Sequence, residues 1–358
     1  MSRFFSQKFA NLEPYTPGEQ PRDTQYIKLN TNESPFPPSS EVLAAASAEA
    51  GKLNLYCDPA CTQLRNAAAM LYGLGPENIL PVNGSDEALY FAFMAFCDDA
   101  HPMAFPDISY GFYPVYAAVN RIPAHVIPLG DDFSVRPEDY CGLKKNIVIA
   151  NPNAPTGMAL GLEEIERIVQ TNPDNVVIID EAYVDFGGTS CVPLIEKYDN
   201  LLVIQTFSKS RSLAGARLGF ALGCETLIGD LNTVKFSVNP YNVNRMTQAA
   251  GVAAIASNDY YMKNCRTVME NRAFTASGLE ALGFEVLPSK ANFLFARTPA
   301  MGGEALYLAL KERGVLVRHF NKDRIGDFLR LTVGSRAQME ALLANLESIL
   351  KEGGASHA

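Results

Sequence analysis

The chain has no tryptophan, only four histidines and no long apolar run among its 358 residues. Because a membrane-spanning helix needs about 20 mostly apolar residues in succession, we expect no membrane association. The first ten residues contain Arg3 and Lys8 but no apolar core, so we expect no secretory signal and a cytoplasmic protein. The histidines lie neither in a metalloprotease motif nor in the setting of a catalytic triad, and we assign them no catalysis.

Positive charge is also scarce, with 30 basic residues against 39 acidic ones and a net charge of −9. This balance disfavours a nucleic-acid partner but leaves room for a local basic pocket that binds a small anion. The seven cysteines are odd in number and lie mostly in apolar surroundings, which is typical of buried reduced thiols. Cys57 and Cys61 are four residues apart, but no pair of histidines accompanies them, so we predict no metal site.

Hydrophobic residues make up 47% of the chain, enough for a large core, and the length favours about two domains. Short apolar runs alternate with helical patterns, which predicts an α/β domain with a mostly parallel sheet and helices on both faces. We predict strands at 79–82, 103–105, 125–129, 146–150, 176–179 and 201–204, and helices at 85–96, 111–119 and 162–170.

From about residue 244 the pattern changes to a helix-rich stretch that reaches residue 282. Strands at 284–287, 292–295, 315–318 and 328–333 and helices at 303–313 and 336–350 then follow. This predicts a smaller α+β domain, with the proline-containing N-terminal arm lying along it. We therefore expect a large domain over residues 30–245 and a small one formed by residues 1–29 and 246–358.

An apolar run at 201–205, typical of a buried strand, ends shortly before Ser208 and Lys209. A lysine at the end of a buried strand is costly unless its charge is paired or lost. The neutral amine is the form that attacks a carbonyl to make an imine. Eight residues later, Arg217 in a Gly- and Ala-rich segment is a candidate for binding a phosphate, with a surface ion pair as the alternative.

Other polar residues also follow predicted strands, where ligands bind in open α/β sheets. Asp180 follows the run 176–179, as a partner for a cation or as an N-cap of the next segment. Gly84 and Ser85 open a predicted helix whose first backbone N–H groups suit a phosphate. Asp86, in the same turn, caps the helix if no ligand binds there. These positions predict one site at this edge of the sheet.

The order of three motifs resembles that of pyridoxal-phosphate enzymes with the aspartate aminotransferase type of fold. The motifs are Asn-Pro-Asn-Ala-Pro-Thr-Gly at 151–157, Asp-Glu-Ala-Tyr at 180–183, and Ser-Lys at 208–209 followed by Arg217. The resemblance implies a large α/β domain that binds pyridoxal 5'-phosphate, with Lys209 holding it as a Schiff base. It also implies that Asp180 pairs with the protonated pyridine nitrogen and that Tyr183 binds the phenolate oxygen.

The same resemblance implies further cofactor contacts. Tyr110 would stack on the pyridine ring, with a core tyrosine as the alternative. An asparagine often precedes Pro-Thr-Gly in such enzymes and binds the phenolate oxygen, but that position is Ala154 here, so the role would fall to Asn153. The residues assigned to the cofactor phosphate and its surroundings are Gly84, Ser85, Asp86, Ser208 and Arg217.

Two segments resemble histidinol-phosphate aminotransferases more narrowly, namely Lys-Leu-Asn-Thr-Asn-Glu-Ser-Pro at 28–35 and Pro-Tyr-Asn-Val-Asn at 240–244. The resemblance runs nearly end to end and implies transfer of an amino group between glutamate and imidazole-acetol phosphate, a step of histidine biosynthesis. In this reaction Lys209 would act as the general acid and base. The resemblance also implies a homodimer with shared active sites, in which Tyr56 of one subunit reaches the cofactor phosphate of the other.

The substrate contacts implied by the resemblance include two arginines. Arg330 lies inside the apolar run 328–333, where a buried guanidinium favours a bidentate anion. It would bind the carboxylate of glutamate in one half-reaction and the phosphate of histidinol phosphate in the other. Arg318 would be a second phosphate contact, with an internal salt bridge as the alternative, and Tyr15 and Asn32 are also assigned to the substrate.

Three other functions stay open at this point. Threonine-phosphate decarboxylation and broad aromatic amino transfer use the same scaffold and most of the same cofactor contacts. The third is a non-catalytic, ligand-sensing domain of the kind found in some transcription regulators. The net negative charge and the early first strands, which leave no length for a DNA-binding extension, disfavour that function.

Overall fold

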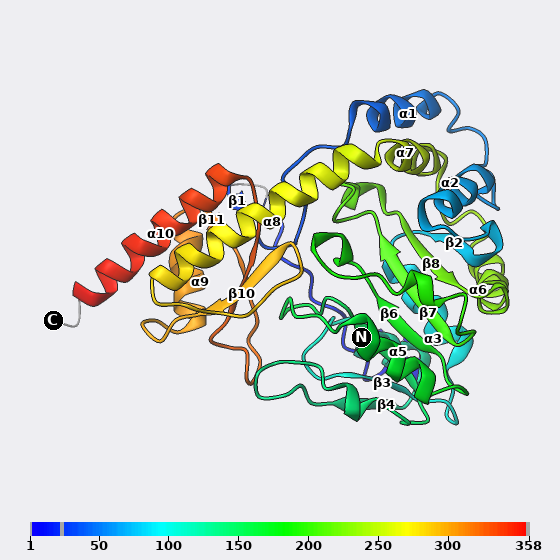
Figure 1. Cartoon of the computed structure of the whole chain (residues 1–358), viewed down its shortest axis with the longest axis horizontal. Coiled ribbons are helices and arrows are strands. Elements are labelled where there is room, and N and C mark those ends of the chain that lie inside the picture. The colour runs from blue at the N-terminus through cyan, green and yellow to red at the C-terminus, as the bar shows by residue number, and fades with distance from the viewer. Residues whose placement is uncertain (1, 22–24, 356–358) are drawn as a thin grey trace.

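The computed structural model describes residues 2–21 and 25–355, and its centre is a seven-stranded sheet (Figure 1). The strand order is β2-β8-β7-β6-β5-β3-β4, and only β8 runs antiparallel to its neighbours. The mostly parallel sheet predicted from the sequence is confirmed. Its strands are β2 (Ile79–Val82), β3 (Met103–Pro106), β4 (Ala124–Ile127), β5 (Asn146–Ala150), β6 (Val177–Asp180), β7 (Leu201–Thr206) and β8 (Gly219–Gly223).

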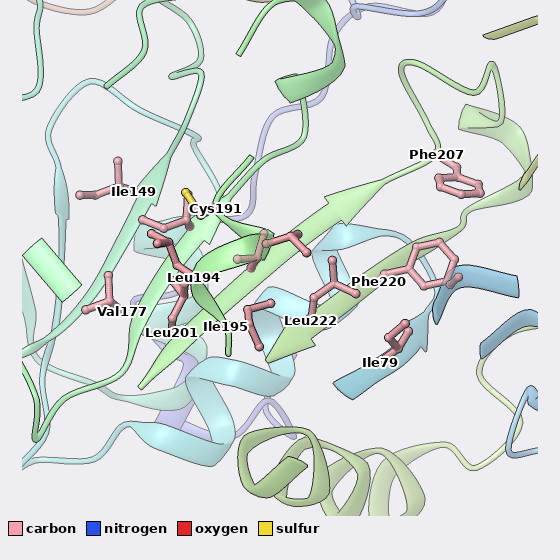
Figure 2. Packing of buried hydrophobic residues seen from close by; sticks show 14 of the residues in the cluster. Ile79, Ile149, Val177, Cys191, Leu194, Ile195, Leu201, Phe207, Phe220 and Leu222 are labelled. Carbon is pink, nitrogen blue, oxygen red and sulfur yellow. The ribbon is translucent and has the colours of Figure 1, made fainter. Parts of the chain in front are cut away.

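Helices cover both faces of this sheet. Successive residues of a strand point to opposite sides, so each central strand packs against helices on both faces. Ile147 and Ile149 pack on one side, against α2 (Thr62–Tyr72), α5 (Leu162–Thr171) and α7 (Arg245–Ala256). Figure 2 shows part of this core. Val148 and Ala150 pack on the other side, against α3 (Ser85–Phe96), α4 (Tyr113–Asn120) and α6 (Glu225–Val238). The central strands are therefore buried on both faces, which explains their continuous apolar sequence.

The second half of the fold surrounds a four-stranded antiparallel sheet with the order β12-β13-β10-β9. The long helix α8 (Asn258–Ala281) extends from α7 toward this sheet (Figure 1). Near the N-terminus, β1 (Ile27–Lys28) pairs in parallel with β11 (Val315–Leu316), which attaches the beginning of the chain to its last quarter. The remaining elements are β9 (Glu285–Val286), β10 (Phe293–Arg297), α9 (Gly303–Glu312), β12 (Arg318–His319), β13 (Leu329–Thr332) and α10 (Arg336–Ala355).

Some elements differ from the sequence prediction. Helix α1 (Ser40–Ala50), α2, α6 and strand β8 were not predicted, and the helix-rich stretch up to residue 282 is two helices, α7 and α8. The strand expected at 315–318 is two short strands, because β11 pairs with β1 whereas β12 pairs with β13. Single turns of 3-10 helix lie at Gln7–Phe9, Pro76–Asn78, Pro137–Asp139, Val184–Phe186, Val192–Leu194 and Ala214–Ala216.

The register of the central strands aligns the segments that carry the candidate site. Ala150, Asp180 and Ile204 lie side by side across β5, β6 and β7. Since these strands are parallel, their carboxyl ends share one edge of the sheet, and the loops that follow them meet there.

Candidate active site

Two adjoining cavities lie at this edge of the sheet. The larger one, about 810 Å³, is lined by segments far apart in the sequence, including parts of 11–18, 30–32, 107–118 and 318–330. The smaller one, about 160 Å³, is lined by the start of α3 and by the ends of β5, β6 and β7. Both cavities share the lining residues Thr31, Tyr110, Ala154, Tyr183 and Lys209.

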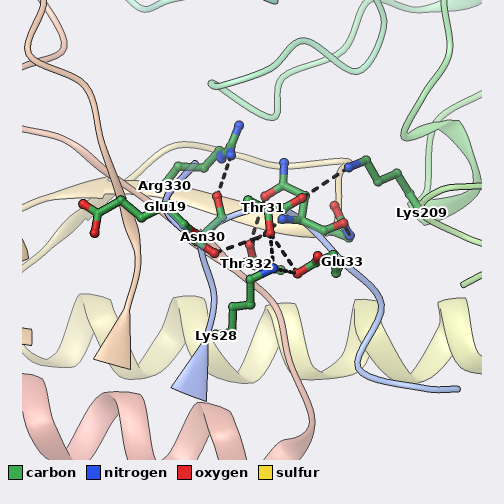
Figure 3. A network of polar contacts seen from close by, with 10 residues as sticks. Glu19, Lys28, Asn30, Thr31, Glu33, Lys209, Arg330 and Thr332 are labelled. Carbon is green, nitrogen blue, oxygen red and sulfur yellow. Dashed lines mark hydrogen bonds and ion pairs between the residues drawn. The ribbon is translucent and has the colours of Figure 1, made fainter. Parts of the chain in front are cut away.

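Lys209 lies where the two cavities meet. Its Nζ atom donates a hydrogen bond to the carbonyl oxygen of Thr31 at 3.2 Å (Figure 3). The same atom lies 5.9 Å from the centre of the Tyr183 ring. No carboxylate of the described residues forms an ion pair with it. The amine is thus held by a neutral acceptor that a ligand can displace.

Asp180 ends β6 and is 4% exposed. Its Oδ2 accepts a hydrogen bond from the Tyr113 hydroxyl at 2.9 Å, and its Oδ1 accepts one from the backbone N–H of Ala182 at 3.2 Å. Burial raises the pKa of this carboxyl to about 6, although the Tyr113 hydroxyl acts in the opposite direction. A buried carboxylate without an ion pair among the described residues fits a cationic ligand group, such as a protonated pyridine nitrogen.

The turn into α3 approaches Arg217 closely. Gly84, the N-cap of α3, has φ +82°, and a Cβ atom there would lie 2.5 Å from Arg217 Nη2. Arg217 forms an ion pair with Asp86 at 2.9 Å, and Asp86 also accepts the Tyr110 hydroxyl at 2.6 Å. The ion pair that was the alternative to a phosphate-binding role for Arg217 is therefore present, but Arg217 also lines the smaller cavity. Backbone N–H groups, hydroxyls and a guanidinium that converge here suit a phosphate. The hydroxyls belong to Ser85 and Ser208.

Asn153 is only 1% exposed and is not among the described residues that line either cavity. Its amide nitrogen donates to Ile108 O and Thr156 Oγ1, and its Oδ1 accepts the Ser109 hydroxyl. These bonds attach the loop after β5 to the loop after β3. The neighbouring Ala154 lines both cavities instead.

Tyr183 and Asn32 meet in the larger cavity. Asn32 Nδ2 donates a hydrogen bond to the Tyr183 hydroxyl at 3.0 Å. Asn32 is itself fixed by Thr332, whose hydroxyl donates to Asn32 Oδ1 at 3.0 Å and accepts from the Asn32 backbone N–H at 3.0 Å. The structure thus brings together two residues that are 151 positions apart.

Arg330 in β13 points into the larger cavity between two aromatic rings, with its guanidinium carbon 5.4 Å from the Phe293 ring centre and 5.5 Å from that of Phe320. Its Nη2 donates to the carbonyl oxygen of Asn30 at 2.9 Å (Figure 3), whereas its buried Nε has no hydrogen-bond partner among the residues that the structure describes. No described carboxylate pairs with it. This arrangement suits an anionic ligand group.

The N-terminal arm closes another side of the larger cavity. The Tyr15 ring stacks on Phe112 with ring centres 4.2 Å apart, and burial raises the pKa of the Tyr15 hydroxyl. Arg318 donates hydrogen bonds to the carbonyl oxygens of Thr16 and Pro17. Arg318 therefore binds the backbone of the arm. Among the described residues it does not form the internal salt bridge that was the alternative.

Tyr56 lies apart from the other predicted residues. It is 80% exposed, lines neither cavity and stacks on Tyr241 with ring centres 4.4 Å apart. The single chain therefore does not bring Tyr56 to the site.

The partners of Lys209 and Asp180 were not predicted. Thr31 offers the carbonyl that binds Lys209, and Tyr113 binds Asp180. The only sequence signal for Tyr113 is its position three residues after Tyr110. Thr31 has no sequence signal, because it acts through its backbone carbonyl, which every residue has. Within the described residues no helix meets the length and apolarity of a membrane span, and no three acidic, histidine or cysteine side chains form a metal-binding group.

Comparison with known proteins assigns this site to a family. The family model "Aminotransferase class I and II" matches residues 24–346. The chain belongs to this family. A histidinol-phosphate aminotransferase of Marinomonas sp. (strain MWYL1) is 50% identical over 353 residues, which cover 98% of this chain and 100% of the relative. Histidinol-phosphate aminotransferase 1 of Bordetella parapertussis is also 50% identical, over 98% of this chain and 99% of the relative.

Solved structures of aminotransferases share the fold. The histidinol-phosphate aminotransferase of Sinorhizobium meliloti, in complex with pyridoxal-5'-phosphate, has a TM-score of 0.84 and 25% identity, and the match covers 91% of each chain. An aspartate aminotransferase of Thermus thermophilus has a TM-score of 0.81 at 20% identity, covering 97% of this chain and all of the other.

Proposed function

We propose that this aminotransferase moves an amino group between glutamate and imidazole-acetol phosphate, giving histidinol phosphate. The relatives that are about 50% identical over nearly the whole chain are named for this activity. The observation that carries the proposal is a pair of cationic groups held by consecutive carbonyls. Asn30 O binds Arg330 and Thr31 O binds Lys209, so one cavity offers an amine beside an unpaired guanidinium (Figure 3).

The smaller cavity is proposed to hold pyridoxal 5'-phosphate. Asp180 would bind the pyridine nitrogen, Tyr183 the phenolate oxygen, and Tyr110 the face of the ring. Asn153 would contribute indirectly, by positioning the loop after β5 near the phenolate oxygen of the cofactor. When bound, the cofactor supplies an electron sink that makes a proton on the substrate's α-carbon acidic. The residues proposed for its phosphate are Gly84, Ser85, Asp86, Ser208 and Arg217, together with Tyr56 of the partner subunit.

The remaining roles belong to the protein's own side chains. The Lys209 amine would move the proton from the substrate's α-carbon to the cofactor's C4′ carbon in one half-reaction, and in the opposite direction in the other. Arg330 would bind the carboxylate of glutamate or the phosphate of histidinol phosphate through its fork of N–H donors. Arg318, Tyr15 and Asn32 would complete the substrate site, and the N-terminal arm would limit the access of water.

We further propose that the chain forms a homodimer in the cytoplasm. Large apolar side chains gather in the α1–α2 loop, where Leu53 is 62% and Leu55 is 59% exposed beside Tyr56. Such a patch is typical of a protein–protein interface. All seven cysteines are free thiols, which supports a reducing compartment.

A spectroscopic titration of the purified protein tests the function. Histidinol phosphate should remove the absorption band of the lysine-bound cofactor, and 2-oxoglutarate should restore it. A Lys209→Ala variant should show neither this band nor turnover. A band that responds only to aromatic amino acids, or release of CO2 from threonine phosphate, would replace the proposed reaction by one of the two alternatives on this scaffold.

A further inference from the structure

We propose that Tyr113, which lies outside the three motifs, is a positioning residue that holds the Asp180 carboxylate in place and ionised for the cofactor's pyridine nitrogen. The inference rests on the proposed function, because it concerns the same cofactor. It adds a residue that touches neither cofactor nor substrate and acts through Asp180.

The contact between the two side chains is direct and buried. The Tyr113 hydroxyl donates to Asp180 Oδ2 at 2.9 Å, and Tyr113 is 0% and Asp180 4% exposed. Burial and the nearby Asp180 charge raise the pKa of Tyr113 well above its usual value, so the phenol keeps its proton and remains a donor. A hydrogen bond to an ionised acceptor in such a setting is among the stronger ones in proteins.

The Tyr113 ring has little freedom to move the hydroxyl away. It begins α4 and packs edge-on against Tyr110, with ring centres 5.7 Å apart at 82°, and it also contacts Phe105. Tyr110 in turn donates its hydroxyl to Asp86. One short segment therefore binds two of the carboxylates of the smaller cavity, Asp86 and Asp180, each through a phenol.

The charges around Asp180 explain why this donor matters. Asp86, on α3, makes ionisation of Asp180 less favourable, and Lys209, after β7, makes it more favourable. Tyr116 on α4 and Tyr183 after β6 are the other titratable groups that face this region, and both are phenols. Without the Tyr113 hydroxyl, Asp180 keeps only the N–H of Ala182, and its carboxyl is protonated at a higher pH.

The test compares pyridoxal 5'-phosphate binding in the wild type, Tyr113→Phe and Tyr140→Phe between pH 5 and pH 9, by equilibrium dialysis of the holoenzyme. The ratio of variant to wild-type dissociation constants cancels the titration of the cofactor itself. For Tyr113→Phe we expect this ratio to be near 1 at pH 9 and to rise to about tenfold at pH 5. Tyr140→Phe is the matched control, since the buried Tyr140 hydroxyl has no hydrogen-bond partner within residues 2–21 and 25–355, and Tyr140 lines neither cavity.

A second measurement separates positioning from a general loss of structure. In an Asp180→Asn background, Tyr113→Phe should leave the ratio independent of pH, because the group that titrates is gone. A ratio that is the same at every pH, at 1 or above it, would overturn the inference and leave the proposed function standing. Failure of the wild type to bind the cofactor would instead overturn the proposed function.

Discussion

At the scale of single residues, Arg330 and Glu181 share an unusual state, because neither forms an ion pair with any described residue. Their surroundings differ, however. Glu181 is 2% exposed and is surrounded by donors, namely Ser190 Oγ, the Cys191 backbone N–H and Gln205 Nε2. Arg330 keeps a buried Nε that has no hydrogen-bond partner in the described part of the chain. The carboxylate is therefore internally satisfied, whereas the guanidinium is available to a ligand.

Arg330→Lys should lower kcat/KM for glutamate by roughly 100-fold, because an ammonium cannot make the two parallel hydrogen bonds of a guanidinium. Steady-state kinetics against Arg297→Lys provides the comparison. Arg297 lies on the neighbouring strand β10 and pairs with Glu285 at the surface, so this variant should stay within about twofold of the wild type. Equal effects of the two changes would contradict the substrate role of Arg330.

Burial raises the pKa of Glu181 to about 7, so this group makes the free energy of unfolding depend on pH. Its contribution to stability is fully present below the unfolded pKa, near 4.5, and is lost as the pH rises through about 7. Glu181→Gln should remove this dependence, a slope of at most about 1.4 kcal/mol per pH unit. Denaturant titrations at several pH values measure the slope, and an unchanged slope between pH 5 and pH 7 would contradict the assignment.

At the scale of elements, the start of α3 shows how a helix terminus is shaped for a ligand. Gly84 adopts a positive φ, which leaves room for the Arg217 guanidinium beside the first N–H groups of the helix. Gly73, at the end of α2, has a similar φ of +68°, but a Cβ there would meet no atom within 4 Å. Both glycines have a positive φ, but only at Gly84 would an added side chain also meet a neighbouring group, Arg217.

Gly84→Ala and Gly73→Ala should each lower the free energy of unfolding by about 1–3 kcal/mol, because both force a side chain to a positive φ. Only Gly84→Ala should also weaken binding of pyridoxal 5'-phosphate, since its Cβ displaces Arg217. Denaturant unfolding and cofactor dialysis on the same samples measure the two effects. Comparable cofactor affinities in both variants would remove Arg217 and this turn from the phosphate site.

The sequence predicts elements well where one local pattern decides them. The parallel strands β3, β5, β6 and β7 follow from apolar runs, and Lys209 and Asp180 lie after or at their ends as expected. Strand β8 has glycine at both ends, Gly219 and Gly223, and gives no such signal. The split between β11 and β12, and the approach of Asn32 to Tyr183, depend on pairing between distant segments, which no local pattern encodes.

At the scale of the whole molecule, the packing supports two domains, and we propose that their junction lies within α8 rather than at residue 245. Ala250 and Ala254 of α7 and Tyr261 of α8 pack in the core beside the large sheet. Cys265, one turn further along α8, packs with Leu29 in the core of the small sheet. On this division the large cavity lies between the domains, since Arg330 and Lys209 come from opposite sides of it.

The proposed dimer predicts a sharp effect of charge in the α1–α2 loop. Leu55→Asp should convert the dimer to a monomer and lower cofactor affinity, because Tyr56 of the partner subunit would no longer reach the site. Leu308→Asp is the control, as Leu308 is 50% exposed on α9, far along the chain from this loop. Sedimentation velocity measures the assembly. A dimer that survives Leu55→Asp with full cofactor affinity would contradict the shared-site arrangement.

The pairing of β1 with β11 also bears on how the protein is made. The residues around the smaller cavity all lie between Thr31 and Arg217, so a ribosome has added every one of them when about 60% of the 358 residues are joined. The arginines of the larger cavity, and the strand that receives β1, emerge only after residue 314. The nascent chain can therefore build its cofactor pocket well before it can recognise a substrate, and interrupted synthesis would leave a product that sequesters cofactor without turning over.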